Sequence, residues 1–126
     1  KEIVIIGDKD SKDYVAKIVS MTRAKSFVGE LDLYELGYLL KISKLFITPD
    51  SGPAFIAQAV GAKTLIYFTS TLPEKYGPYS NNVKIYYNPV LCSPCYKDSC
   101  RVKDNFKCIG NVDVEQIFDI ARNMLS

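Results

Sequence analysis

PDSGPAFIAQAVGAKTLIYF, residues 49–68, is the stretch that decides the fold class of this 126-residue chain. An apolar run over residues 45–47 precedes it, and Asp50-Ser51-Gly52 then leads into a helical pattern from Pro53 to about Val60. The stretch ends in Thr64-Leu65-Ile66-Tyr67-Phe68, a run typical of a buried strand. A strand, a helix and a second strand in this order predict a βαβ unit with parallel strands.

The same alternation continues on both sides of this unit. Asp32 and Glu35 have the spacing of a capping box ahead of a leucine-rich helix, and Asp113 or Asn111 is expected to cap the last helix. Strands are predicted at residues 3–6, 26–28, 45–47, 64–68 and 83–86. We therefore expect an α/β domain with a Rossmann-like parallel sheet of about five strands and helices on both faces.

Composition limits the classes of function. Hydrophobic residues make up 48% of the chain and charged residues 24%, which fits one globular domain. The net charge of +2 gives no strong field for nucleic acid or anionic membranes, so no nucleic-acid partner is expected. Neither a membrane-spanning run of about 20 apolar residues nor a signal-peptide pattern is present, which predicts a cytoplasmic domain. Histidine, the commonest general base, is absent.

The Asp50-Ser51-Gly52 turn has two interpretations. In a parallel sheet, ligands bind where strands end and helices begin, and the amides of a helix N-terminus attract phosphate oxygens. Gly52 would let the backbone approach a ligand closely, while the Ser51 hydroxyl would donate to the same oxygens. Asp and Ser are, however, also the preferred N-cap residues of an ordinary strand-to-helix junction. The turn alone leaves both interpretations open.

A second polar loop follows the strand at 64–68 and supports the ligand-binding interpretation. It reads TSTLPEKYGPYS, residues 69–80, and is rich in hydroxyl groups, glycine and proline. Because the carboxyl ends of parallel strands share one edge of a sheet, the two loops are expected to contact one ligand.

Three blocks in this order resemble one family. ITPDSGPAFIAQAVGAKTLIYF, TSTLPEKYGPYS and CSPCYKDSCRVKDNFKC, followed by a last amphipathic helix, are similar to the C-terminal half of glycosyltransferase family 9 enzymes. These are the ADP-heptose:lipopolysaccharide heptosyltransferases and their relatives, which have the two-domain GT-B fold. The resemblance extends from about Ile3 to Ser126. It implies that residues 1–126 form the donor domain, and the start at Lys1 without Met agrees with a part of a longer protein.

The resemblance also implies residue roles and partners. The diphosphate of a nucleotide sugar, an ADP-sugar, would bind at Asp50, Ser51 and Gly52. The second-rank candidates for donor binding would be Thr69, Thr71 and Gly77. The acid that meets the ribose of the donor would be Asp10 or Asp8. The glycan or lipid-linked acceptor and the general base would belong to an N-terminal domain that this chain lacks, so the isolated domain is expected to be inactive and to need no cofactor. The full-length protein would act in the bacterial cytoplasm, at the inner face of the inner membrane.

Phe55 departs from the family pattern, because the family usually has histidine three residues after the glycine. A phenyl ring cannot donate a hydrogen bond to a diphosphate, so Ser51, backbone amides or Lys75 would have to stabilise the leaving group. Phe55 therefore favours, as an alternative, a degenerate and non-catalytic family member. We expect the ring to pack in the core rather than to stack on a ligand.

Residues 88–110 carry all four cysteines and lack a helical or strand period. The spacing Cys92-x2-Cys95-x4-Cys100-x7-Cys108 is compact enough for one tetrahedral zinc ion, while free thiols and disulfides are the alternatives. Arg101 and other basic residues would offset thiolate charge. A second hypothesis is a cysteine-stapled module that binds a protein or nucleic acid, with stacking faces from Tyr86, Tyr87, Tyr96 and Phe106.

Overall fold

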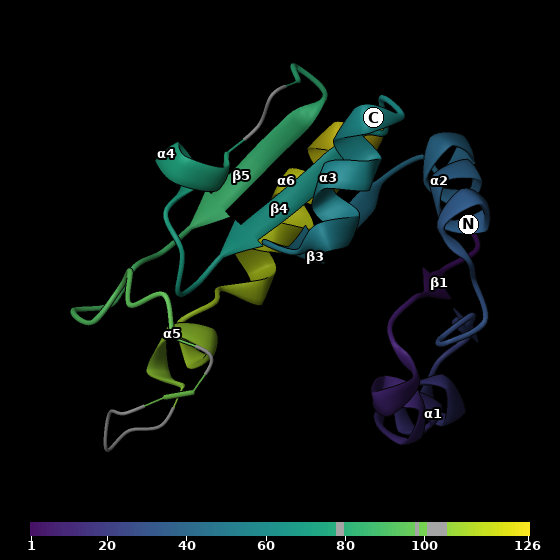
Figure 1. Ribbon diagram of the computed structural model, residues 1–126, viewed down its shortest axis with the longest axis horizontal. Coiled ribbons are helices and arrows are strands. Elements are labelled where there is room, and N and C mark those ends of the chain that lie inside the picture. Colours follow the sequence, from purple (N-terminus) through teal and green to yellow (C-terminus); the bar gives the residue numbers. More distant parts are fainter. Residues whose placement is uncertain (78–79, 98, 101–105) are drawn as a thin grey trace. The chain divides into compact units, whose positions relative to one another are not determined.

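The computed structural model of the chain describes residues 1–77, 80–97, 99–100 and 106–126. It divides into two compact units, Lys1–Leu36 and Gly37–Ser126, each of which is described by itself. Both contain parallel strands with helices around them, which confirms the predicted α/β class (Figure 1). In the described residues, no helix is long and apolar enough to cross a membrane.

The first unit is built on a short parallel ladder. Its elements are β1 (Val4–Ile5), a 3-10 turn η1 (Lys9–Ser11), α1 (Lys12–Met21) and β2 (Lys25–Ser26). The ladder continues beyond the strand ends, because the Gly29 amide donates to the Gly7 carbonyl at 2.9 Å. Gly29 has φ +70°, and an added Cβ would lie 2.8 Å from Cγ of Lys9, so only glycine fits here. Val15 and Val28 are the buried residues of this unit's core.

Helix α2 (Leu33–Ile42) begins with the predicted capping box. The Asp32 amide donates to Oε2 of Glu35 and the Glu35 amide donates to Oδ1 of Asp32, each at 2.8 Å. The leucines of the predicted apolar stripe differ in burial, because Leu40 is buried at 2% exposure whereas Leu33 is 64% exposed.

The second unit is a three-stranded parallel sheet in the order β3-β4-β5. Its elements are β3 (Phe46–Pro49), α3 (Gly52–Ala59), β4 (Thr64–Phe68), α4 (Pro73–Tyr76), β5 (Val83–Tyr87), α5 (Lys107–Gly110) and α6 (Val114–Leu125). The central strand β4 is the most buried, with Leu65 and Ile66 at 0% and 1% exposure. Its near-continuous apolar sequence is what a strand covered on both faces requires.

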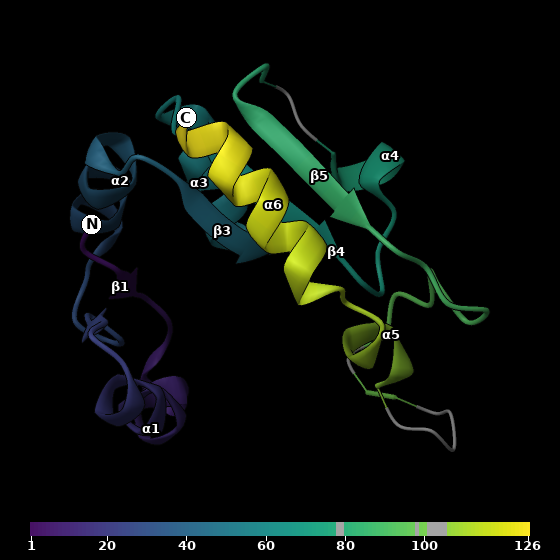
Figure 2. The same ribbon diagram turned by 180° about the vertical axis from the view of Figure 1, so that it is seen from behind.

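Helices cover both faces of this sheet (Figures 1 and 2). Ala54 of α3 packs in one buried cluster with Ile66 and Phe68 of β4. Ala121 of α6 packs in the other cluster with Leu65 of β4. The two clusters take alternate residues of β4 because successive side chains of a strand point to opposite faces. Each helix presents a small alanine, which lets its backbone approach the sheet closely.

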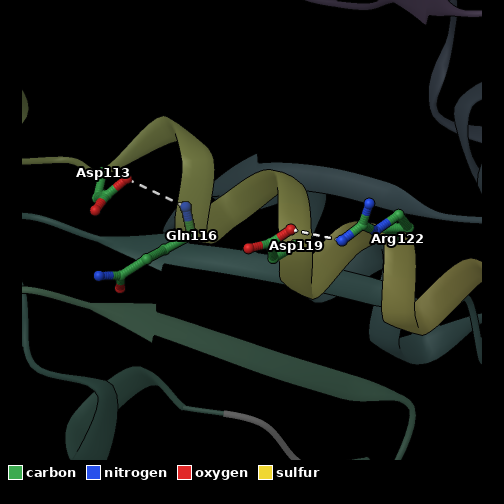
Figure 3. A network of polar contacts seen from close by, with 4 residues as sticks. All are labelled: Asp113, Gln116, Asp119 and Arg122. Atoms are coloured by element: carbon green, nitrogen blue, oxygen red, sulfur yellow. Dashed lines mark hydrogen bonds and ion pairs between the residues drawn. The ribbon is translucent and has the colours of Figure 1, made fainter.

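The C-terminus of α3 and the N-terminus of α6 are stabilised in different ways. Just beyond α3, Gly61 has a left-handed φ of +74°, and the Ala62 amide donates to the Ala57 carbonyl at 2.9 Å. Helix α6 begins at Asp113, whose Oδ1 accepts from the Gln116 amide at 3.1 Å (Figure 3). That cap confirms Asp113, one of the two residues expected to begin the last helix.

The strands differ from the expectation in how they join. Among the described residues, they form a two-stranded and a three-stranded parallel sheet instead of one sheet of five strands. The strands β1 and β2 have only two residues each and belong to the first unit. About five strands were expected and the described part of the chain contains five, with β4 at the expected bounds. The cysteine-rich segment at 88–110 contains the short helix α5.

Candidate functional site

The candidate site begins where β3 ends. The Asp50 amide donates to the Tyr67 carbonyl at 3.3 Å, so the sheet holds the chain in register up to the turn. Thr48 is buried, and its Oγ1 lies 3.1 Å from Oγ of Ser51. Thr48 had no role in the sequence analysis. The two-residue period of a strand places Thr48 on the same face as Phe46, and this is the signal that could have indicated a buried hydroxyl.

The start of α3 is open toward solvent. Ser51 has extended backbone angles and, in the part of the chain that the structure describes, its side chain makes no capping hydrogen bond. Pro53 lies in the first turn and has no amide hydrogen to lose. A Cβ added to Gly52 would meet no described atom within 4 Å. Amides of the first helical turn carry the positive end of the helix dipole, so this open position suits an anionic oxygen.

The two polar loops predicted to meet are joined by a hydrogen bond. Oγ1 of Thr71 donates to Oδ2 of Asp50 at 2.7 Å, across 21 positions of sequence. Both residues are half-buried, and so is Thr69, which directly follows β4. The structure therefore brings Asp50, Ser51 and Gly52 together with Thr71 at the carboxyl edge of the sheet. Their binding of a ligand stays a prediction.

Gly77 has a structural reason for being glycine. An added Cβ would overlap the carbonyl oxygen of Pro73 in the preceding turn. Any side chain would therefore displace the end of α4. Its predicted contact with a ligand stays a prediction, and Pro78 and Tyr79 of the same motif lie outside the described residues.

The two acids considered for the ribose lie in the first unit. Asp8 caps the η1 turn, because its Oδ1 accepts from the Ser11 amide at 3.2 Å and from the Ser11 hydroxyl at 2.9 Å. Asp10 lies within η1 and is exposed. Asp8 is thus committed to local structure, which leaves Asp10 as the better of the two candidates. Its role stays a prediction.

Phe55 does not pack in the core as expected. It is 40% exposed, in contrast to its neighbours Ala54 and Ala57, which are buried at 1% and 0% exposure. Helical spacing explains the difference, because the alanines face the sheet and residue 55 lies on another side of α3. The ring therefore lies at the surface of the helix turn that follows Gly52.

The four cysteines are free thiols in the structure. Cys92 and Cys95 are exposed, whereas Cys100 and Cys108 are half-buried. Among the described residues, no three side chains of His, Cys, Asp or Glu come close enough together to hold a metal ion. Sγ of Cys100 accepts a hydrogen bond from the Phe106 amide at 3.0 Å. Zinc at Cys92, Cys95, Cys100 and Cys108 stays a prediction, and Arg101 lies outside the described residues.

Tyr96 connects the cysteine-rich segment to the loop after β4. Its amide donates to the Ser70 carbonyl at 2.9 Å, and Nζ of Lys75 lies 5.1 Å from the centre of its ring. Partial burial raises the pKa of the nearby Tyr87, and Glu74 and Tyr96 raise that pKa further. The sequence analysis named Tyr96 as a stacking face only. A contact between segments 26 positions apart leaves no signal in local periodicity.

The fold and the site define a class of protein. A parallel α/β sheet with polar loops and a helix N-terminus at its carboxyl edge is typical of nucleotide-binding domains. The family model "Glycosyltransferase family 9 (heptosyltransferase)" matches residues 2–105, and the chain therefore belongs to this family. The match confirms the resemblance on which the predicted site residues depend.

Comparisons with individual proteins agree with this family membership. The chain is 28% identical to lipooligosaccharide heptosyltransferase 2 of Campylobacter jejuni serotype O:2 over 104 residues, which cover 82% of this chain and 32% of that protein. The enzyme of serotype O:6 is also 28% identical, over 81% of this chain and 32% of its own length. A crystal structure of a family 9 glycosyl transferase from Veillonella parvula superposes with a TM-score of 0.77 at 22% identity, over 98% of this chain and 36% of that one. The chain thus spans about a third of the length of these relatives.

Proposed function

We propose that this chain is the donor domain of a heptosyltransferase-like glycosyltransferase. It binds the diphosphate of an ADP-sugar at Asp50, Ser51 and Gly52, with Thr69 and Thr71 beside them. Membership of glycosyltransferase family 9 supports a nucleotide-sugar donor and a glycan acceptor in general. The heptose and the lipopolysaccharide-type acceptor rest on the names of the Campylobacter relatives.

One observation carries the proposal: the hydrogen bond from Thr71 to Asp50. It fixes two polar loops side by side at the open start of α3. Asp50 uses Oδ2 for this bond, so Oδ1 of the same carboxylate can accept from a hydroxyl of the donor. The Ser51 hydroxyl and the Gly52 amide are the donors for phosphate oxygens, which the positive end of the helix dipole also attracts. Acceptor and donor groups in this arrangement match the two ends of a phosphate-linked sugar.

The rest of the reaction belongs to the full-length enzyme. The acceptor and the general base are assigned to an N-terminal domain, and the transfer takes place in the bacterial cytoplasm at the inner face of the inner membrane. The isolated domain is expected to catalyse nothing, because the general base is expected in that N-terminal domain. It needs no cofactor for catalysis.

Calorimetric titration of the full-length protein with ADP tests the donor site. The wild-type protein is expected to bind ADP, and the double variant Asp50→Ala with Gly52→Val is expected to lose most of this affinity. Asp113→Ala is the matched control, since it removes an acid from the start of α6 on the other face of the sheet. Absence of ADP binding at millimolar ligand, or equal affinity of the double variant, would contradict the proposal.

A second candidate function is favoured by Phe55. The exposed ring stands in the first turn of α3, where the family usually has a histidine. A domain of this kind would bind the donor weakly and support no transfer. The variant Phe55→His should then raise the affinity for ADP several-fold. An affinity that falls instead would show that the ring itself contacts the donor.

A further inference from the structure

The loop between β4 and α4 is held from two sides. On one side, Thr71 donates to Asp50 of the β3–α3 turn at 2.7 Å. On the other side, the carbonyl of the adjacent Ser70 accepts from the Tyr96 amide at 2.9 Å. The consecutive residues Ser70 and Thr71 thus form hydrogen bonds with two different segments of the chain. The position of the Thr71 hydroxyl depends on both contacts.

A second contact joins the same segments. Nζ of Lys75, in α4, lies 5.1 Å from the centre of the Tyr96 ring, within the range of a cation–π interaction. Lys75 itself is fixed by its own amide, which donates to the Leu72 carbonyl at 3.1 Å. The ring and the backbone of one residue therefore hold both ends of the segment from Ser70 to Lys75.

The backbone of Tyr96 is in an unusual conformation. Its φ is +55°, in the left-handed region that residues with large side chains rarely adopt. Such a conformation persists only where the surrounding contacts fix it, and it is often found at functional positions. The contacts of Tyr96 with Ser70 and Lys75 are the contacts that fix its backbone.

We infer that Tyr96 is a positioning residue of the donor site. It fixes the loop from Ser70 to Lys75, so that the Thr71 hydroxyl stays on Asp50 and the Lys75 ammonium stays beside the loop that contacts the nucleoside diphosphate. The cysteine-rich segment is then part of the donor site through Tyr96. This inference rests on the proposed donor function.

Four variants of the full-length protein test it by ADP titration: Tyr96→Leu, Tyr96→Phe, Lys75→Met, and the double variant of Tyr96→Leu with Lys75→Met. Tyr96→Leu removes the ring face and should weaken ADP binding about three- to fivefold, the range expected for a cation–π contact of this kind. Tyr96→Phe keeps the ring and the amide and should bind ADP within about twofold of wild type. The double variant of Tyr96→Leu with Lys75→Met should be no weaker than the weaker single variant, because coupled residues are not additive.

The outcomes separate the inference from the proposed function. Unchanged ADP affinity in Tyr96→Leu, or a double variant whose loss is the product of the two single losses, overturns the inference alone. If the wild-type protein binds no ADP, the proposed function fails, and amide hydrogen exchange without ligand decides the inference. Faster exchange at residues 70–75 and 96 in Tyr96→Leu, with unchanged exchange in α6, supports it. Unchanged exchange at those residues overturns it.

Discussion

Helices α3 and α6 cover opposite faces of the same sheet, yet they begin in different ways. At α6, the Asp113 carboxylate accepts from the Gln116 amide at 3.1 Å, so the helix caps itself (Figure 3). At α3, within the described ranges, Ser51 makes no such bond and lies against Thr48, while Asp50 accepts from Thr71. The polar side chains before α3 thus contact Thr48 and Thr71 and do not cap the helix.

The difference shows how one motif serves two purposes. An acid or hydroxyl ahead of a helix stabilises the helix when its oxygen turns toward the amides. When the oxygen turns away, as at α3, the positive end of the helix dipole can attract an external anion. The sequence pattern is nearly the same in both cases, and only the direction of the side chain separates a cap from a candidate site.

The largest effect on ADP binding is expected from a substitution at Gly52. A valine there should leave the thermal stability almost unchanged, because an added Cβ meets no described atom within 4 Å. It should weaken ADP binding by about tenfold or more, since the side chain would occupy the position of a phosphate oxygen. Calorimetry and a thermal melt of the same variant measure the two effects. Lost stability with retained affinity would make α3 an ordinary helix start.

Thr71→Val should have the next largest effect. It removes the hydrogen bond to Asp50 and frees the carboxylate from the position in which Thr71 holds it. The expected cost is about 1 kcal/mol in ADP binding, or roughly fivefold in affinity. Thr71→Ser keeps a hydroxyl and is the matched control. Equal affinity of the valine and serine variants would contradict the role of this bond.

Asp113→Ala tests the capped helix. Loss of the bond to Gln116 should lower the free energy of unfolding by about 1 kcal/mol. Ser51→Ala should lower it less, because the described residues show no capping bond from Ser51 to lose. Denaturant unfolding of the two variants measures the difference. A greater loss of stability in Ser51→Ala would reverse the comparison.

The smallest effect is expected at Asp119→Asn, nearly two turns beyond the cap of α6. The Asp119–Arg122 ion pair at 3.0 Å is exposed on both sides (Figure 3). Exposed pairs of this kind contribute between zero and about 1 kcal/mol, and salt screens them. The unfolding free energy should change by less than about 0.5 kcal/mol and become insensitive to the mutation at high salt. A larger change would show that α6 depends on this pair as well as on Asp113.

The sequence predicted those elements that depend on local residue patterns. The run at 64–68 matched β4 because a strand buried on both faces needs continuous apolar residues. The capping box at Asp32 was also evident, since its partners are three residues apart. Both polar loops were expected at one edge of the sheet, although the pattern could not tell which hydroxyl would contact Asp50. The link from Tyr96 to Ser70 depends on how the chain folds back, which periodicity does not record.

The left-handed end of α3 at Gly61 has a consequence for protein engineering. The bond from the Ala62 amide to the Ala57 carbonyl closes the helix two residues before β4 begins. An inserted residue here would break that bond and loosen the helix whose other end forms the open start. Linkers, tags and length variation should therefore be kept out of residues 60–63, and relatives that retain the site are expected to retain the length of this connection.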